Sequence, residues 1–319
     1  MTGADPMRLL VSGVRPEAER VISLLLEDPH GDDLPAWEPG AHVDVTLPSG
    51  RIRQYSLCGE PSDRRRYRIA VLDVSDGRGG SREIHDSVRT RDVLEIRGPR
   101  NHFRLMEATS YLLVAGGIGI TPILPMAREL ARRQADWRLV YCGRGLTSMA
   151  FLEELGELDT RHPSRIMLVP EDRDGRPDLA AELRRHDAGA VYCCGPVGLL
   201  AAAETATAST RPDAAFVSER FTGAGSGSAA DDPGFEVYCA RSDVRLHVPA
   251  DRSVLDCLRE AGLPVLSSCE QGICGTCELS VLNGDPDHRD SLLNDEDYAG
   301  GAFLACVSRS RSAVLTLDI

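Results

Sequence analysis

The stretch that most constrains the fold reads Cys269-Glu270-Gln271-Gly272-Ile273-Cys274-Gly275-Thr276-Cys277, and Cys306 follows twenty-nine positions after its last residue. Three thiolates on one short loop can wrap a compact inorganic cluster while backbone N–H groups point at its sulfurs. Gly272 and Gly275 predict the left-handed turns that such a loop requires. We expect Cys306, which arrives from a distant segment, to close the site.

The C-x4-C-x2-C…C spacing is that of a plant-type 2Fe–2S cluster. A zinc site is the alternative, but zinc sites prefer paired C-x2-C knuckles and do not need the four-residue arm. The predicted metal ligands are therefore Cys269, Cys274, Cys277 and Cys306. The six other cysteines lie in apolar or strand-like runs and are expected to be buried free thiols: Cys58, Cys142, Cys193, Cys194, Cys239 and Cys257.

The region around this loop forms the last of three predicted domains. Residues 223–234 contain no large apolar side chain and are expected to be a flexible linker. In the domain that follows, residues 235–319, we expect a hairpin over Phe235–Val248, a helix over Ser253–Ala261 capped by Ser253, and a final strand over Ser312–Ile319.

The chain before the linker changes its pattern near residue 105. Residues 1–105 show short alternating segments broken by Pro, Gly and Asp, which predict an antiparallel β-barrel or a sandwich. Residues 106–222 alternate strand and helix, which predicts an α/β domain with a parallel sheet and helices on both faces. Its expected strands are Tyr111–Ala115, Arg138–Cys142 and Ala190–Cys194, and its expected helices lie near Pro122–Gln134, Met149–Leu158 and Pro196–Thr205.

Two glycine-containing turns follow strands of the α/β domain. One reads Gly116-Gly117-Ile118-Gly119-Ile120-Thr121-Pro122, and the other follows Tyr192 as Cys193-Cys194-Gly195-Pro196. Such glycines let the backbone approach a pyrophosphate, although Pro122 stands where the third glycine of the usual dinucleotide fingerprint would be. Because the carboxyl ends of parallel strands share one edge, the two turns predict a ligand crevice.

A third motif lies in the barrel region and reads Arg53-Gln54-Tyr55-Ser56-Leu57-Cys58, with Gly77-Arg78-Gly79-Gly80-Ser81 further on. An Arg fork, hydroxyls and a glycine-rich turn can hold a phosphate, and Tyr55 can lie against a flat ring. Arg and Tyr on a barrel strand are also common as surface and core residues, so this motif alone decides nothing.

Composition excludes several other classes of protein. The 319 residues include 36 basic residues, all of them Arg, so a Walker-type lysine and a pyridoxal Schiff base are excluded. A net charge of −13 argues against nucleic acid as a partner. Residues 1–6 do not resemble a secretory signal. The uncharged stretch Ala108–Ala127 holds five Gly and Pro residues, which favours strand, turn and helix over a membrane span. We expect a cytoplasmic protein with no membrane contact.

Together, in order and spacing, the motifs resemble the phthalate dioxygenase reductase family, which includes vanillate demethylase reductases. The resemblance covers essentially the whole chain. It implies a multidomain fold: a flavin-binding barrel, a ferredoxin reductase-like nucleotide domain and an α+β β-grasp ferredoxin domain. It also implies that Ser218-Glu219-Arg220-Phe221 matches the family's E-S-F segment, with Arg220 in place of the usual Ser.

Cofactors and site residues follow from the same resemblance. The implied cofactors are FMN, NADH and the 2Fe–2S cluster. The residues expected at the flavin are Arg53, Gln54, Tyr55, Ser56, Ala70, Val71, Gly79, Gly80, Ser81 and Phe221. Those expected at the nicotinamide nucleotide are Gly117, Gly119, Thr121, Arg144, Cys194, Gly195 and Pro196, with Ser148 near the adenosine ribose. The expected catalytic residues are Phe221, Glu219 and Cys194.

The implied activity is that of an NADH-dependent oxidoreductase, the reductase component of an oxygenase system. Electrons would pass from NADH through FMN and the cluster to a Rieske-type terminal oxygenase, and such reductases are commonly monomers. The preference for NADH over NADPH rests on the family alone. Two alternatives remain open: the same reductase serving a cytochrome P450, and a non-enzymatic iron–sulfur redox sensor.

Overall fold

A computed structural model describes residues 6–74, 79–221, 233–267, 270, 272–273, 275–290 and 292–319. The chain divides into two compact units, Met1–Phe221 and Thr222–Ile319, and each is described by itself. Most of the expected linker, residues 223–232, lies outside the described residues.

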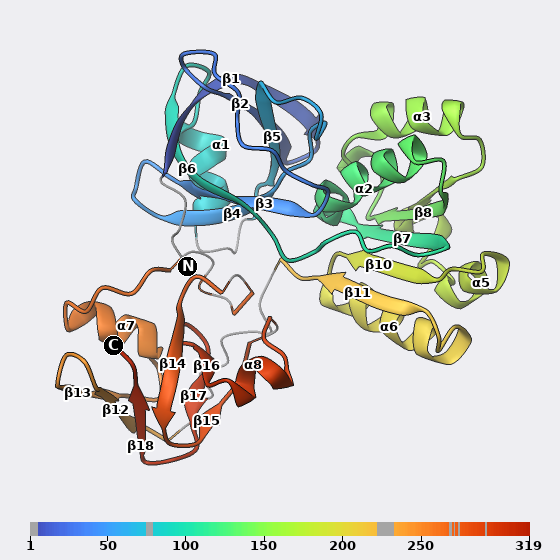
Figure 1. Cartoon of the computed structure of the whole chain (residues 1–319). Coiled ribbons are helices and arrows are strands. Elements are labelled where there is room, and N and C mark those ends of the chain that lie inside the picture. Colours follow the sequence, from blue (N-terminus) through green and yellow to red (C-terminus); the bar gives the residue numbers. More distant parts are fainter. Residues whose placement is uncertain are drawn as a thin grey trace. The chain divides into compact units, whose positions relative to one another are not determined.

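An antiparallel six-stranded barrel forms the first half of the first unit, as predicted (Figure 1). Its strands are β1 Met7–Ala18, β2 Val21–Glu27, β3 Ala41–Thr46, β4 Ile52–Ser56, β5 Arg66–Leu72 and β6 Val93–Asn101. They run in the order β4-β3-β6-β1-β2-β5, and a bridge between Leu57 and Ile69 joins the two edges. Alternate side chains fill the interior with Leu, Val and Ile, which is what buries one face of each strand.

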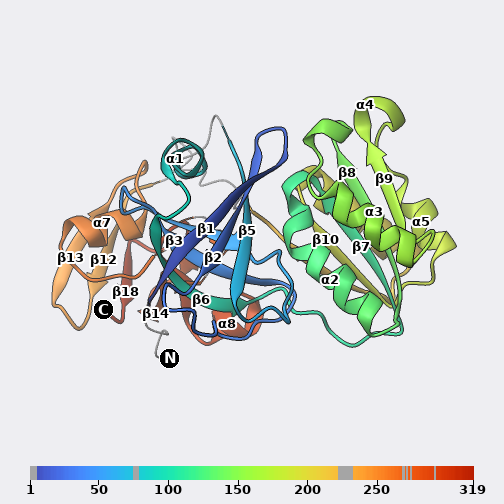
Figure 2. The ribbon, with the colours of Figure 1, turned by 90° about the horizontal axis from the view of Figure 1, so that it is seen from above.

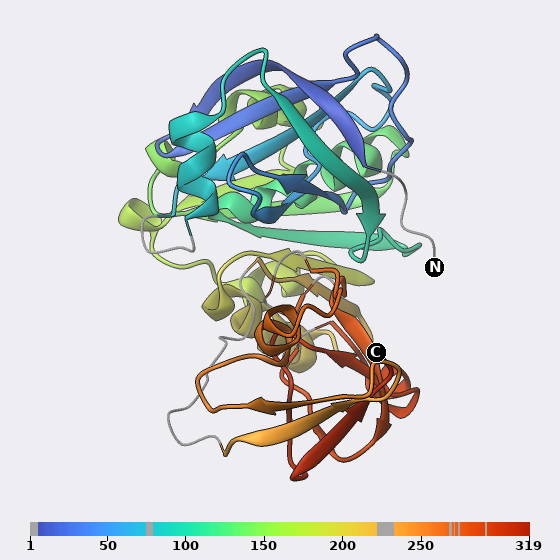
Figure 3. The same cartoon turned by 90° about the vertical axis from the view of Figure 1, so that its left-hand side faces the viewer.

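Helix α1, Gly80–Ser87, was not predicted from the sequence. It packs against one side of the barrel (Figures 2 and 3) and buries Ile84 in the barrel core, together with Val88 just after its end. A single large apolar side chain in the eight residues of α1 gives too weak a period to predict a helix from the sequence. The helix begins after Gly79, whose φ of 78° is left-handed, and no side chain caps its first N–H groups.

The second half of this unit is a parallel sheet covered by helices on both faces, which confirms the α/β prediction (Figure 1). The strands are β7 Ser110–Gly116, β8 Asp136–Gly143, β9 Ile166–Pro170, β10 Ala190–Cys194 and β11 Ala215–Glu219, in the order β11-β10-β7-β8-β9. Helices α2 Ile120–Arg132 and α3 Leu152–Arg161 cover one face. Helices α5 Leu179–Arg185 and α6 Val197–Thr210 cover the other, and α4 Glu171–Asp174 follows β9.

Helix α3 begins three residues later than expected, because residues 146–148 form a 3₁₀ turn and Phe151 takes a left-handed φ of 64°.

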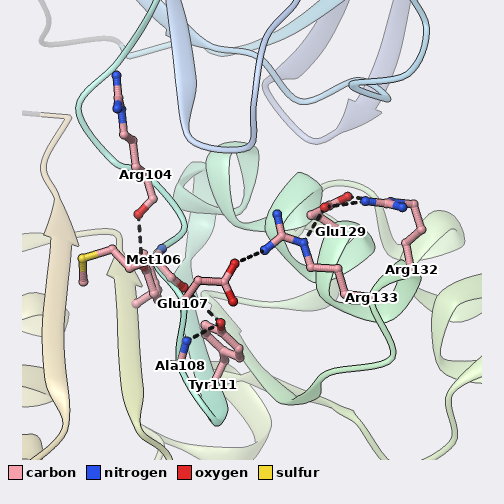
Figure 4. A network of polar contacts seen from close by, with 9 residues as sticks. Arg104, Met106, Glu107, Ala108, Tyr111, Glu129, Arg132 and Arg133 are labelled. Atoms are coloured by element: carbon pink, nitrogen blue, oxygen red, sulfur yellow. Dashed lines mark hydrogen bonds and ion pairs between the residues drawn. The ribbon is translucent and has the colours of Figure 1, made fainter.

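The segment Arg104–Ala108 connects the barrel to the sheet, and two tyrosine hydroxyls form hydrogen bonds with its backbone (Figure 4). Tyr192 donates to Arg104 O and accepts from Met106 N, and Tyr111 accepts from Ala108 N and donates to Met106 O.

The second unit is an α+β fold with a five-stranded mixed sheet in the order β13-β12-β18-β14-β16. Its elements are β12 Phe235–Cys239, β13 Val244–Val248, α7 Val254–Glu260, β14 Glu278–Asn283, β15 Pro286–Asp287, α8 Asp295–Ala299, β16 Ala302–Leu304, β17 Arg309–Ser310 and β18 Val314–Leu317. The predicted hairpin is present, and Ser253 caps α7 by accepting from Asp256 N. Among the described residues, none of the helices combines the length and hydrophobicity that a bilayer crossing requires.

Candidate functional site: a flavin cradle, a nucleotide crevice and a cluster loop

Arg53 and the start of α1 form a cradle whose groups have the chemistry that a phosphate requires. Arg53 Nη1 donates to Ile52 O at 2.8 Å, and its chain passes so close to Gly80 that a Cβ there would lie 2.6 Å from Arg53 Nε. None of the described side chains caps the N–H groups at the start of α1, and a helix N-terminus favours an anion. Ser81 accepts from Val74 N at 3.1 Å and so fixes one end of the preceding loop. Gly77 and Arg78 of the predicted turn lie outside the described residues.

Strands β4 and β5 border this cradle. Gln54 Nε2 is buried, and the described part of the chain offers it no hydrogen-bond partner; a flavin ring can satisfy such a donor. Burial raises the pKa of Tyr55, so its hydroxyl stays protonated. The side chains of Ala70 and Val71 are buried, and the Val71 carbonyl faces the His85 ring at 2.9 Å.

Three polar groups from distant segments meet beside β4. The Ser56 hydroxyl bonds the carboxyl of Glu219, the last residue of β11, and Cys194 at the end of β10 pairs with Glu219 in the sheet. Burial raises the pKa of Glu219 to about 8, and the Ser56 bond opposes part of that rise. Burial, with the Glu219 charge, holds the pKa of the Cys194 thiol well above its usual value. Glu219 Oε2 is buried and has no hydrogen-bond partner among the described residues.

Phe221 ends the first unit and packs against the apolar cluster shared by the barrel and the sheet. Its ring is partly buried and follows Glu219 by two residues. The expected contact of Phe221 with a flavin stays a prediction.

The two glycine turns pack against each other at the carboxyl edge of the sheet. A Cβ at Gly119 would lie 2.2 Å from Cys194 O, and one at Gly195 would lie 3.0 Å from Gly116 Cα. These glycines therefore serve close packing of the turns, while Gly117, with a φ of 54°, faces open space and leaves room for a ligand. The buried Thr121 hydroxyl donates to Ile118 O at 2.9 Å, so it stabilises the turn itself.

A further group of residues follows β8 and β9. Arg144 is exposed, and its carbonyl accepts from Asp172 N at 3.0 Å. The Asp172 carboxylate lies against Gly145, where a Cβ would be 2.6 Å from Oδ2. Ser148 is not directed to a ligand, because its hydroxyl bonds the Gly145 carbonyl at 2.8 Å. Sequence reasoning missed Asp172, although an acidic residue just after a parallel strand is a signal that points to a ribose.

Two of the four predicted cluster ligands, Cys277 of the loop and the distant Cys306, lie on neighbouring segments. Cys277 and Cys306 are both buried, and the residue before Cys306 donates its N–H to Cys277 O at 3.2 Å. Gly272 and Gly275 have φ values of 69° and 71°, the left-handed turns that the sequence predicted. Cys269 and Cys274 lie outside the described residues. The thiol donors that are described fit an iron–sulfur cluster.

Two family models match the chain. Residues 237–311 match a 2Fe–2S iron–sulfur cluster binding domain, and residues 113–205 match an oxidoreductase NAD-binding domain. The chain is 42% identical to vanillate O-demethylase oxidoreductase from Pseudomonas sp. strain HR199, over 98% of this chain and 100% of the relative. It is 38% identical to a solved phthalate dioxygenase reductase, over 98% of both chains, with a TM-score of 0.77.

The chain belongs to the phthalate dioxygenase reductase family. This family membership confirms the resemblance, and with it the NAD-binding oxidoreductase domain and the 2Fe–2S domain. A type IV self-sufficient cytochrome P450 monooxygenase is also similar, with 39% identity over 98% of this chain and a TM-score of 0.84. The present chain spans only 41% of the length of that P450 chain.

Proposed function

We propose that this chain is the reductase component of an oxygenase system, taking electrons from NADH and delivering them through FMN and a 2Fe–2S cluster to a Rieske-type oxygenase. The observation that carries the proposal is the meeting of β4 with the ends of β10 and β11, where Ser56, Glu219 and Cys194 converge. Bound FMN supplies the ability to accept two electrons together and to release them singly.

The residues of the chain supply binding, orientation and proton placement. Arg53 and the α1 N-terminus hold the phosphate, while Gln54 and Tyr55 line the ring. Since the pKa of Glu219 is about 8, its carboxyl carries a proton at neutral pH and can present it at Oε2. The Cys194 thiol stays protonated, so it offers the ring a small, uncharged contact surface. Cys269, Cys274, Cys277 and Cys306 hold the cluster.

We place the domain boundaries at residues 1–105, 106–222, 223–234 and 235–319, as the motifs suggest. The division of the chain after Phe221 is consistent with the third of these segments being a linker. The six cysteines outside the cluster loop form no disulfide within the described residues, which supports a cytoplasmic location: Cys58, Cys142, Cys193, Cys194, Cys239 and Cys257. We further propose that the protein works as a monomer, which light scattering on the purified holoprotein tests.

A cytochrome P450 is the second candidate partner, because a self-sufficient P450 chain carries a reductase similar to this one. The redox-sensor alternative loses its support, since the chain matches an oxidoreductase NAD-binding domain. Anaerobic addition of NADH should bleach first the flavin and then the cluster absorbance. Reconstitution with a purified Rieske oxygenase or a purified P450 then identifies the acceptor, and failure to bleach the flavin would refute the function.

A further inference from the structure

Glu154 of α3 pairs with two arginines from two other elements of the first unit. Arg68 of β5 donates from Nη2 to Glu154 Oε1 at 2.7 Å, and Arg128 of α2 donates from Nη2 to Glu154 Oε2. Each carboxylate oxygen thus has its own guanidinium, one from the barrel and one from the α/β half. Sequence reasoning did not single out any of these residues.

The surroundings shield this triad from water. The side chains of Arg68, Arg128 and Glu154 are 13%, 21% and 27% exposed. The Arg68 guanidinium lies 4.4 Å from the centroid of the Phe151 ring, and Arg128 also donates to Gly59 O at 3.4 Å. Shielded pairs are screened less by salt than surface pairs, and removing one partner leaves uncompensated charge.

Both arginines lie close in sequence to the expected cofactor sites. Arg68 is two residues before Ala70 on β5, the strand that borders the flavin cradle. Arg128 belongs to α2, the helix that begins at Ile120 directly after the nucleotide turn. Glu154 therefore ties a strand of the flavin site to the helix that carries the nucleotide turn.

We propose that Glu154 is a positioning residue that sets the approach of the nicotinamide to the flavin by fixing the barrel against α2. The inference rests on the proposed function. Hydride transfer requires the reacting atoms to lie about 3–3.5 Å apart, and a misplacement of about 1 Å lowers the rate about a hundredfold. A contact distant from the chemistry can therefore control the rate without touching either cofactor.

The two halves stay together without Glu154. Glu19 N donates to Thr147 O at 2.8 Å, and one apolar cluster includes Val21, Cys58 and Ala70 from the barrel with Ile123 and Leu124 from α2. Glu154→Gln keeps the size of the side chain and removes its charge. We therefore expect a folded variant that retains FMN but whose halves are held less tightly.

The test is anaerobic stopped-flow reduction of the FMN-loaded full chain by NADH at a series of concentrations. Glu154→Gln should lower the limiting rate of flavin reduction about tenfold while the apparent Kd for NADH changes less than twofold. A second readout needs no turnover: addition of NAD⁺, which does not reduce the flavin, should perturb the visible circular dichroism of FMN less in the variant. The control is Glu129→Gln, since Glu129 of α2 binds Arg132 of the same helix and Arg133 directly after its end (Figure 4).

Wild-type protein that is not reduced by NADH would refute the proposed function itself. Wild-type reduction with an unchanged limiting rate in Glu154→Gln overturns the positioning role. A fall of the same size in Glu129→Gln also overturns it, because any lost ion pair would then suffice. If Glu154→Gln does not fold, Arg128→Gln replaces it. This variant keeps the Arg68 pair and should lower the limiting rate by a smaller factor, and an unchanged rate there overturns the proposal.

Discussion

Arg53 lies over Gly80, the first residue of α1, so closely that a Cβ at Gly80 would come within 2.6 Å of Arg53 Nε and 2.7 Å of Arg53 Cγ. The two residues belong to elements separated by the whole of β5 and the loop after it. With glycine at this position, the guanidinium-bearing chain crosses the start of the helix without moving aside for a Cβ. A phosphate seated there would be held by a cation and a helix N-terminus together.

Arg53→Ala should weaken FMN retention more than it weakens folding. A charge-assisted contact to phosphate is worth about 1.5–3 kcal/mol, which is about ten- to a hundredfold in affinity. The purified variant should be depleted of flavin and recover NADH-driven dye reduction when FMN is added in excess. Arg66→Ala, on the exposed edge of β5, is the matched control and should keep its flavin. Stoichiometric flavin in Arg53→Ala would remove this residue from the site.

Glu219 makes the stability of the first unit depend on pH. Its folded-state pKa of about 8 lies above the ordinary value of 4.5, so the folded protein binds this proton more tightly than the unfolded chain. The stability it contributes is complete below about pH 4.5 and is lost as pH rises through about 8. Melting midpoints of the FMN-loaded protein should therefore fall less between pH 6 and 9 in Glu219→Gln than in wild type. Equal slopes, or the same flattening in the exposed-residue control Glu153→Gln, would contradict the buried carboxyl.

The sequence was sufficient where a pattern is local and periodic. β10 has the bounds expected from its apolar run, Ala190–Cys194, and the capping Ser253 marks the start of α7. It was insufficient for α1, in which only Ile84 joins the apolar core. It was also insufficient for β9, whose Met167 and Leu168 are exposed on an edge strand. An edge strand lacks the continuous burial that makes central parallel strands visible.

The same distinction holds for the site. Three of the four expected cluster ligands lie within nine consecutive residues, and their spacing is characteristic, so the type of cluster could be predicted from the sequence. The pairing of Ser56 with Glu219, and of both arginines with Glu154, depends on how distant strands and helices pack. No periodicity in the chain encodes those contacts.

Asp172 should favour NADH over NADPH. Its carboxylate lies beside Gly145, which follows Arg144 in the same turn. We expect the adenosine ribose at this turn, so the 2′-phosphate of NADPH would be repelled by the negative charge of Asp172. Asp172→Asn should raise kcat/KM for NADPH relative to NADH by about fivefold to tenfold. Asp174→Asn removes one charge from the same short helix, where Asp174 pairs with Arg173, and should leave the ratio unchanged. An unaltered ratio in Asp172→Asn would exclude this carboxylate from the discrimination.

Cys306→Ser should abolish the cluster and leave the flavin site intact. The first unit has its own apolar clusters, and the cluster loop belongs to the second unit. NADH-driven reduction of a two-electron acceptor should therefore persist at near wild-type rates while iron, labile sulfide and cytochrome c reduction are lost. Cys257→Ser, which alters a buried thiol of α7 that is not a predicted ligand, should keep its iron. Loss of flavin activity in a folded Cys306→Ser protein would refute the modular arrangement.

Acidic residues of the second unit divide into two groups that the sequence did not separate. Residues 235–319 contain 14 acidic residues and 7 Arg. Asp287 pairs with Arg289 at 2.7 Å and with Arg311 at 3.5 Å, and Asp290 accepts from Leu293 N at 2.8 Å, so these carboxylates stabilise the fold. Further acidic residues gather on α8, and two of them are exposed: Asp295 and Glu296. These two make no ion pair within the described part of the chain.

The exposed α8 carboxylates should steer the cluster-bearing unit to a basic patch on the oxygenase. Exposed charges act over about 8 Å at physiological salt and lose that reach as salt rises. Electron delivery to the oxygenase should therefore slow much more with added salt than NADH reduction of the flavin, and Asp295→Asn/Glu296→Gln should remove most of that difference. Asp243→Asn/Asp251→Asn removes the same charge elsewhere on the unit and should retain the wild-type salt dependence. If both double variants lose it equally, net charge rather than α8 directs the encounter. Equal salt dependence of the two half-reactions in wild type would exclude steering altogether.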